Sequence, residues 1–120
     1  MHELALAEAV LDVVLAHAGG RRVARIELTV GRLRQVVPGA LAFAVELAAR
    51  GTPAEGAALA LTVAPAAGRC GECGGETALD RFPFACAACG SLAVVPTAGA
   101  ELRIDAIEVD DDPQSKEATP

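Results

Sequence analysis

Four cysteines in two evenly spaced pairs are the strongest chemical signal in the sequence. Cys70 and Cys73 are separated by two residues, as are Cys86 and Cys89, and a glycine follows each pair. A two-residue gap lets both thiolates of one turn converge on a single ion, and the glycine permits the tight backbone of such a knuckle. The two knuckles together can close a tetrahedron of sulfurs. The sequence therefore predicts a structural Zn²⁺ site of the zinc-ribbon type.

Other uses of the four cysteines stay open from their spacing alone. Iron occupies the same sulfur cage in rubredoxin-type sites, and the two pairs are also compatible with redox dithiols or disulfides. Four protein sulfurs leave zinc no open position for water or substrate, which argues against a catalytic metal. The sequence also has no Gly-x-Ser-x-Gly motif and no paired histidine and carboxylate. We therefore expect a protein that is not an enzyme.

The N-terminus is a second place where metal chemistry is possible, because His2 directly follows Met1. A free α-amine, a deprotonated backbone amide and the imidazole of residue 2 can form fused chelate rings. With a fourth nitrogen or oxygen this gives the square-planar geometry typical of Cu(II) or Ni(II). From chemistry alone, His2 is equally compatible with an exposed residue at a chain end. His17 is interpreted as structural, because an imidazole suits the negative end of a helix dipole.

Composition and charge exclude several classes of partner. The 120-residue chain has a net charge of -6, whereas binding of nucleic acid depends on lysine and arginine. The cysteine-containing stretch is acidic too, with two arginines and three carboxylates between residues 68 and 99. No apolar run approaches the roughly 20 residues of a membrane span, and no leader peptide is visible. We therefore expect a cytoplasmic protein that binds neither nucleic acid nor membranes, in a compartment where thiols stay reduced.

The elements that must position these groups can be predicted from periodicity. Residues 3–18 have helical spacing and end at two glycines, and Pro38 suits the first turn of a second helix ending near residue 49. Alternation predicts strands at residues 24–30, near residues 59–63 and at residues 101–109. The last strand changes register, which predicts a bulge near Asp105 or Ala106. The apolar faces are expected to include, in the first helix, Leu4, Ala7, Leu11, Val14, Leu15 and Ala18; in the first strand, Ala24, Ile26, Leu28 and Val30; and in the second helix, Leu41, Val45 and Ala48, with Phe43 and Leu47 beside them.

The order of elements predicts an α+β fold. The simplest packing is a three-stranded sheet covered by two helices, with a zinc-ribbon-like module inserted before the last strand. We expect an α/β domain of residues 1–65 with 100–110, a zinc-binding module of residues 66–99 and a disordered tail of residues 111–120. Phe82 and Phe84 are expected to pack inside the module rather than form a stacking platform for bases.

Taken together, the motifs resemble the HypA/HybF family of hydrogenase maturation nickel metallochaperones. The resemblance extends from Met1 to Asp110 and depends on features that occur in the family's order. These are Met1-His2-Glu3-Leu4, Val36-Val37-Pro38 before the second helix, Gly51-Thr52 after it, Glu55-Gly56 before the second strand, the two Cys-x-x-Cys pairs, and the strand from Glu101 to Val109. One departure is Ala87, which stands where the second knuckle of the family often has proline.

The resemblance implies roles that the spacing alone leaves open. His2 would be the essential nickel ligand, assisted by the Met1 amine and the backbone of Glu3, and the four cysteines would hold structural zinc. The implied partners are a nickel-binding GTPase accessory protein and the precursor of the hydrogenase large subunit, with urease maturation proteins in some members. The alternative is a zinc-ribbon adaptor that binds only proteins and transfers no nickel.

Overall fold

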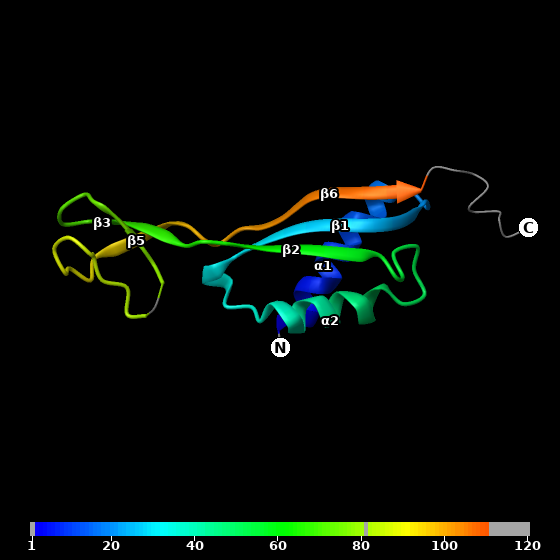
Figure 1. Cartoon of the computed structure of the whole chain (residues 1–120), viewed down its shortest axis with the longest axis horizontal. Coiled ribbons are helices and arrows are strands. Elements are labelled where there is room, and N and C mark those ends of the chain that lie inside the picture. Colours follow the sequence, from blue (N-terminus) through cyan, green and yellow to red (C-terminus); the bar gives the residue numbers. More distant parts are fainter. Residues whose placement is uncertain (1, 81, 111–120) are drawn as a thin grey trace, which may run out of the picture. The chain divides into compact units, whose positions relative to one another are not determined.

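The computed structural model describes residues 2–80 and 82–110. Met1, a predicted nickel ligand, and the tail predicted at residues 111–120 lie outside the described residues. The predicted order of helices and strands is confirmed (Figure 1). The elements are α1 (His2–Ala18), β1 (Arg22–Gly31), the 3₁₀ helix η1 (Arg32–Arg34), α2 (Pro38–Ala49), β2 (Ala58–Ala64), β3 (Ala67–Cys70), β4 (Glu76–Ala78), β5 (Val94–Ala98) and β6 (Leu102–Asp110).

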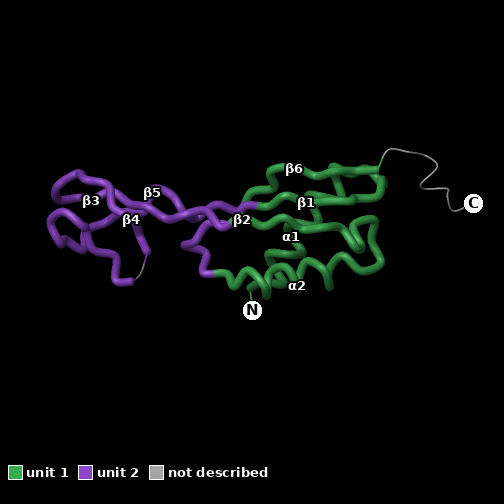
Figure 2. The backbone as a smooth tube through the Cα atoms, in the orientation of Figure 1, with its two compact units in different colours: residues 1–28, 36–62, 103–120 green, residues 29–35, 63–102 purple. Residues whose placement is uncertain are grey.

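The described chain forms two compact units, which Figure 2 distinguishes by colour. Among the described residues, the first unit draws on residues 2–28, 36–62 and 103–110, and it contains both α-helices. The second unit consists of residues 29–35 and 63–102, and it contains all four cysteines.

The first unit is built on a mixed sheet whose strand order is β2-β1-β6. β1 and β2 run in the same direction, whereas β6 runs in the opposite one (Figure 1). Parallel neighbours need a crossover connection, and α2 provides it between β1 and β2. α1 packs against α2, and both helices lie on the same side of the sheet. The predicted α+β architecture of three strands and two helices is thus confirmed.

The helix boundaries follow the predicted signals. α1 ends before Gly19 and Gly20, whose φ angles of 61° and 87° lie in the left-handed region that glycine adopts without strain. α2 begins at Pro38, in the first turn, where the missing N–H of proline costs no helical hydrogen bond. Glycine therefore ends α1, and proline begins α2.

The core of the first unit is built from aliphatic residues, and it corrects several of the predicted faces. In α1, Val10 is buried although it was not placed on the predicted face, whereas Leu4, which was, is 47% exposed. In β1, Val23 is buried and Ala24 is exposed. In α2 the buried residues step through turns of 3.6 residues, which leaves Phe43 58% exposed. The buried residues of the two helices and of the first-unit part of β1 are Ala7, Val10, Leu11, Val14, Ala18, Val23, Ile26, Leu28, Leu41, Ala44, Val45 and Ala49.

The exposure pattern of β6 follows the predicted change of register. Leu102 and Ile104 are half-buried, the next two residues are both exposed, and Ile107 and Val109 are again half-buried. Two successive exposed residues shift the buried side from even to odd numbers, as an extra residue in the pleat does. The bulge near Asp105 and Ala106 stays a prediction that this pattern supports.

The second unit carries a small antiparallel sheet in the order β4-β3-β5. The central residue Gly68 lies opposite Thr77 on one side and Pro96 on the other. A Cβ atom on Gly68 would lie 2.6 Å from Cγ1 of Val94, so only glycine fits this crowded position. β3 ends at Cys70, and the sheet thereby leads directly into the first cysteine pair.

Candidate metal centre

The structure brings the four predicted cysteines together in one cluster. All four Sγ atoms lie within 4.8 Å of one another, although Cys73 and Cys86 are far apart in the chain. The two cross-knuckle pairs, Cys70 with Cys89 and Cys73 with Cys86, each have a sulfur–sulfur distance of 3.6 Å. The four cysteines are free thiols rather than disulfides. This excludes the disulfide interpretation for the structure as described.

The two knuckles have matching backbone hydrogen bonds. In the first knuckle (residues 70–74), the amide of Gly74 donates to the carbonyl of Cys70 at 2.9 Å. In the second knuckle (residues 86–90), the amide of Gly90 donates to the carbonyl of Cys86 at 2.8 Å. Both glycines have positive φ angles, 77° and 79°, which only glycine adopts without strain. The predicted role of the glycine after each pair is confirmed.

Backbone amides also point at the sulfurs and favour their ionised form. The amides of Glu72 and Cys73 lie 3.3 and 3.4 Å from Sγ of Cys70, and the amide of Ala88 lies 3.4 Å from Sγ of Cys86. Donation from Cys73 lowers the pKa of the Cys70 thiol to about 6, although burial opposes the shift. Donation from the amides of Cys89 and Ala88 likewise lowers the pKa of Cys86. The first thiol of each pair therefore ionises more easily than the thiol of an ordinary cysteine.

The exposed thiol of Cys89 behaves differently. The backbone amide of Ser91 lowers its pKa, but the neighbouring sulfur of Cys70 and partial desolvation outweigh this and raise it to about 11. Two thiols so close together cannot both ionise easily without a cation between them. A bound cation would therefore stabilise the ionised form of the whole cluster.

The donor set fits zinc. With a Zn–S bond of about 2.3 Å, the sulfurs of a regular tetrahedron lie about 3.8 Å apart, close to the cross-knuckle distances of 3.6 Å. Bound zinc would supply a fixed cross-link between the knuckles. Cys70 and Cys86 are only 1% and 3% exposed, whereas Cys73 and Cys89 face the solvent. Each knuckle thus contributes one buried and one exposed cysteine.

The module surface shows one correction. The rings of Phe82 and Phe84 meet edge to face with their centroids 5.3 Å apart, but Phe82 is 79% exposed and does not pack in the interior. Arg69 is committed to Glu76 at 3.9 Å, in an exposed ion pair.

One residue near the cluster carries no signal in the sequence. Thr77 in β4 is a buried polar side chain, and its Oγ1 accepts the amide of Ala87 at 3.1 Å. A threonine in a glycine-rich stretch predicts nothing about a partner ten positions away. Only the three-dimensional arrangement of the knuckles brings the two together.

The residues predicted to bind nickel are placed at the start of the first unit. His2 is exposed and is the first residue of α1. The carboxylate of Glu3 accepts a hydrogen bond from the backbone amide of Val37 at 3.3 Å. Val37 is the N-cap residue of α2, so Glu3 connects the beginnings of the two helices. Nδ1 of His17 donates to the carbonyl of Val13 in its own helix at 2.9 Å, which fits the structural interpretation.

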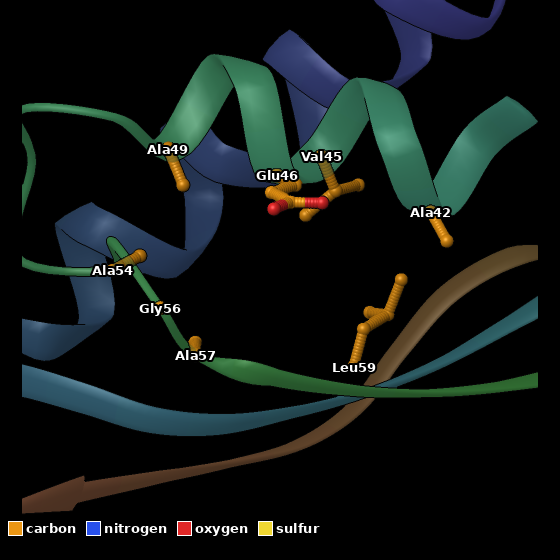
Figure 3. Close-up of a pocket in the computed structure, with 8 residues that line it drawn as sticks. All are labelled: Ala42, Val45, Glu46, Ala49, Ala54, Gly56, Ala57 and Leu59. Atoms are coloured by element: carbon orange, nitrogen blue, oxygen red, sulfur yellow. The ribbon is translucent and has the colours of Figure 1, made fainter.

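A hollow of about 260 Å³ lies between α2 and β2 (Figure 3). Its walls are small and apolar, with Leu59 pointing from β2 toward α2 and Ala42 and Ala49 facing it from the helix. Glu46 is the one charged residue in its lining. No predicted metal ligand lines this hollow. Neither α-helix of the described chain combines the length and the hydropathy that a membrane crossing requires.

Comparisons with known proteins agree with this site. A family model described as "Hydrogenase/urease nickel incorporation, metallochaperone, hypA" matches residues 1–109. The hydrogenase maturation factor HypA of Nostoc punctiforme is 38% identical over 111 residues, which cover 92% of this chain and 97% of that protein. HypA of Dechloromonas aromatica is 40% identical over 113 residues, covering 92% of this chain and all of that protein.

The fold agrees with the sequence match. The solution structure of the nickel metallochaperone HypA from Helicobacter pylori superimposes with a TM-score of 0.66 at 19% identity, covering 91% of this chain and 97% of that one. A full-length family match, close relatives of equal length, the same fold and a four-cysteine zinc site coincide in one chain. The chain belongs to the HypA family, and it is a nickel metallochaperone of hydrogenase maturation rather than an enzyme.

Proposed function

We propose that this chain binds Ni(II) at its N-terminus and delivers it to the precursor of the large subunit of a nickel–iron hydrogenase. A nickel-binding GTPase accessory protein is the proposed partner in the transfer, and urease maturation proteins are proposed as additional recipients. The support for these recipients is the description of the matching family, which names nickel incorporation into both hydrogenase and urease.

The proposed nickel ligands are the imidazole and amide of His2, the amine of Met1 and the backbone of Glu3. The amides in the first turn of a helix have no partner within that helix, so nickel would take nitrogens that α1 does not need for its own hydrogen bonds. The carboxylate of Glu3 already accepts the amide of Val37, which favours its backbone as the group offered to the metal. The exposure of His2 is the single observation that carries this assignment.

The proposed division of labour follows from how each site can exchange ligands. A chain end releases its donors one at a time, so an acceptor protein can take the cargo by stepwise substitution. Four thiolates on two backbone-anchored knuckles form a closed site, which suits zinc that stays in place. We assign Cys70, Cys73, Cys86 and Cys89 to zinc on this ground.

The proposal includes the domain arrangement and the compartment. Residues 1–65 with 100–110 are proposed as the nickel-binding domain, and residues 66–99 as a module that depends on zinc. The cytoplasm is the proposed location, because free thiols persist in a reducing compartment. The acidic charge of the chain supports protein partners rather than nucleic acid.

Nickel titration by calorimetry on protein with a free first residue tests the assignment. We expect one Ni(II) per chain for the native protein and loss of this binding in His2→Ala. His17→Ala is the matched control, because it removes the other imidazole of the chain from an exposed position while leaving the N-terminus intact. A peptide extension before Met1 should also weaken binding, because it converts the amine to an amide.

The alternative, a zinc-ribbon adaptor without nickel transfer, predicts a different result. Its zinc content would be one per chain, and nickel would bind with the same weak affinity to the native protein and to His2→Ala. That result would contradict the proposed nickel site. Loss of binding in His17→Ala as well as in His2→Ala would contradict the proposed ligand set.

A further inference from the structure

The two knuckles are attached to the rest of the module by different kinds of group. In the first knuckle, the residue after the first cysteine is Gly71, and its amide donates to the backbone carbonyl of Ala93 at 2.7 Å. In the second knuckle, the equivalent residue is Ala87, and its amide donates to the side-chain hydroxyl of Thr77 at 3.1 Å. One attachment is therefore independent of side-chain identity, whereas the other needs a hydroxyl at position 77.

The rest of the two knuckles is nearly identical, which isolates this difference. The amide of Cys70 donates to the carbonyl of Gly75 at 2.8 Å, and the amide of Cys86 donates to the carbonyl of Ser91 at 2.8 Å. The amides of Gly74 and Gly90 close each turn in the same way. The second knuckle therefore differs from the first chiefly in depending on Thr77.

The attachments cross between the two halves of the module. Ala93 follows the second knuckle in the chain but holds the first, and Thr77 follows the first knuckle but holds the second. Thr77 lies in β4, which pairs with β3, the strand that ends at Cys70. The hydroxyl therefore ties the second knuckle to β4, the neighbour of the strand that presents Cys70.

Burial makes the hydroxyl of Thr77 a firm anchor. Thr77 is 7% exposed, and it is one of two buried polar side chains recorded among residues 2–80 and 82–110. The bond itself is part-buried, because its acceptor Thr77 lies inside the module whereas Ala87 is exposed. The bond to Ala87 also requires an N–H at that position, which proline lacks.

We propose that Thr77 is a positioning residue of the four-cysteine site, whose hydroxyl holds Ala87 and so sets the second knuckle at the separation from the first that one zinc ion needs. The proposal rests on zinc occupying the four cysteines. Thr77 touches no sulfur in the recorded bonds and acts through the backbone of the knuckle. Its effect is on metal affinity and on the symmetry of the site.

The first test compares Thr77→Val with Thr77→Ser. Valine keeps the shape of threonine but removes the acceptor, whereas serine restores the hydroxyl. Loss of a group that orients metal ligands typically weakens metal affinity by about 10–100-fold, and we expect about 10-fold for Thr77→Val in zinc competition against a chromophoric chelator. Thr77→Ser should bind zinc within about twofold of the native protein, well below that 10–100-fold range.

Thr97→Val is the matched control within the same module. Its hydroxyl donates to the carbonyl of Ala67 at 3.3 Å from an exposed position on β5, away from either knuckle. We expect its zinc affinity to equal that of the native protein. Cobalt substitution gives a second readout: the visible absorption of the Co(II) form should change in Thr77→Val and return in Thr77→Ser, which a general loss of stability would not produce.

Ala87→Pro tests the bond from its other end. Proline removes the donor, so adding Thr77→Val to Ala87→Pro should cause no further loss of zinc affinity. The proposal is overturned if Thr77→Val binds zinc as tightly as the native protein, if Thr97→Val loses as much, or if Thr77→Val costs another tenfold in the Ala87→Pro background. Failure of the native protein to bind one zinc would instead contradict the zinc assignment itself.

Discussion

Two glycines that look interchangeable in the sequence should respond in opposite directions to the same substitution. Gly31 ends β1, and its amide donates to the carbonyl of Glu101 at 2.7 Å. A Cβ atom at this position would fall onto the carbonyl group of Gly99, well inside van der Waals contact. Gly39 lies in the first turn of α2, where a Cβ atom would meet nothing within 4 Å.

The structure gives the size of the two effects. Gly31→Ala must push apart two backbone segments, which at an overpacked position costs about 1–3 kcal/mol. The movement also strains the bond from Gly31 to Glu101 and the 2.7 Å bond from the amide of Leu33 to the carbonyl of Gly99, each worth about 0.5–1.5 kcal/mol. The expected loss is about 4 kcal/mol. Gly39→Ala should instead raise the free energy of unfolding by about 0.5–1 kcal/mol, because alanine restricts the unfolded chain and favours the helix.

Urea unfolding of zinc-loaded protein measures both changes. Far-ultraviolet circular dichroism is the suitable probe, since the sequence has neither tryptophan nor tyrosine, and zinc release to a coloured chelator reports separately on the second unit. Gly31 and Gly99 both belong to that unit, so zinc release should move to lower urea in Gly31→Ala. The reasoning is refuted if Gly31→Ala unfolds within about 0.5 kcal/mol of the native protein, the range of a neutral surface substitution.

Three further predictions concern the metal module. Cys86→Ser should lower zinc from one per chain to nearly none by atomic absorption while α1 and α2 keep their circular dichroism; retention of a full zinc would contradict the four-sulfur site. Zinc affinity should fall more steeply with decreasing pH below about 6. The pKa of the Cys70 thiol is lowered to about 6, so below that pH zinc must displace one more proton. A plot of log affinity against pH with the same slope above and below pH 6 would argue against this. Removal of zinc by a chelator should open residues 66–99 to limited proteolysis before the helices; cleavage within α1 at the same rate would contradict a separate zinc-dependent module.

Local signals explain why so much of the fold is predictable. Gly19 and Gly20 end α1, and Pro38 begins α2, because these residues restrict or free the backbone wherever they occur. Alternation predicts the positions of β1, β2 and β6 for a similarly local reason. The cysteine pairs are predictable because a two-residue gap is itself the geometry of the knuckle.

The errors come from interactions that depend on the partner rather than on the segment. Periodicity indicates which residues share a face of a helix but not where the neighbouring element ends. Leu4, placed on the predicted face of α1, and Phe43, placed beside that of α2, are therefore both exposed. Phe82 is also exposed, because the aromatic character of a residue does not by itself predict that it is buried. The meeting of Gly31 with Gly99 and the bond from Ala87 to Thr77 join distant parts of the chain, and neither leaves a local signature.

The four cysteines are unequally exposed, so one side of the cluster is more accessible to dissolved reagents than the other. Cys70 and Cys86 are shielded, whereas Cys73 and Cys89 are open to dissolved oxidants and competing thiols. A reagent must reach a metal-bound thiolate to react with it. Oxidation by peroxide and removal of the metal by small thiols should therefore begin at Cys73 and Cys89. Cys70 and Cys86 would then still bind the ion, so that reductants could restore the oxidised outer thiols before zinc is lost.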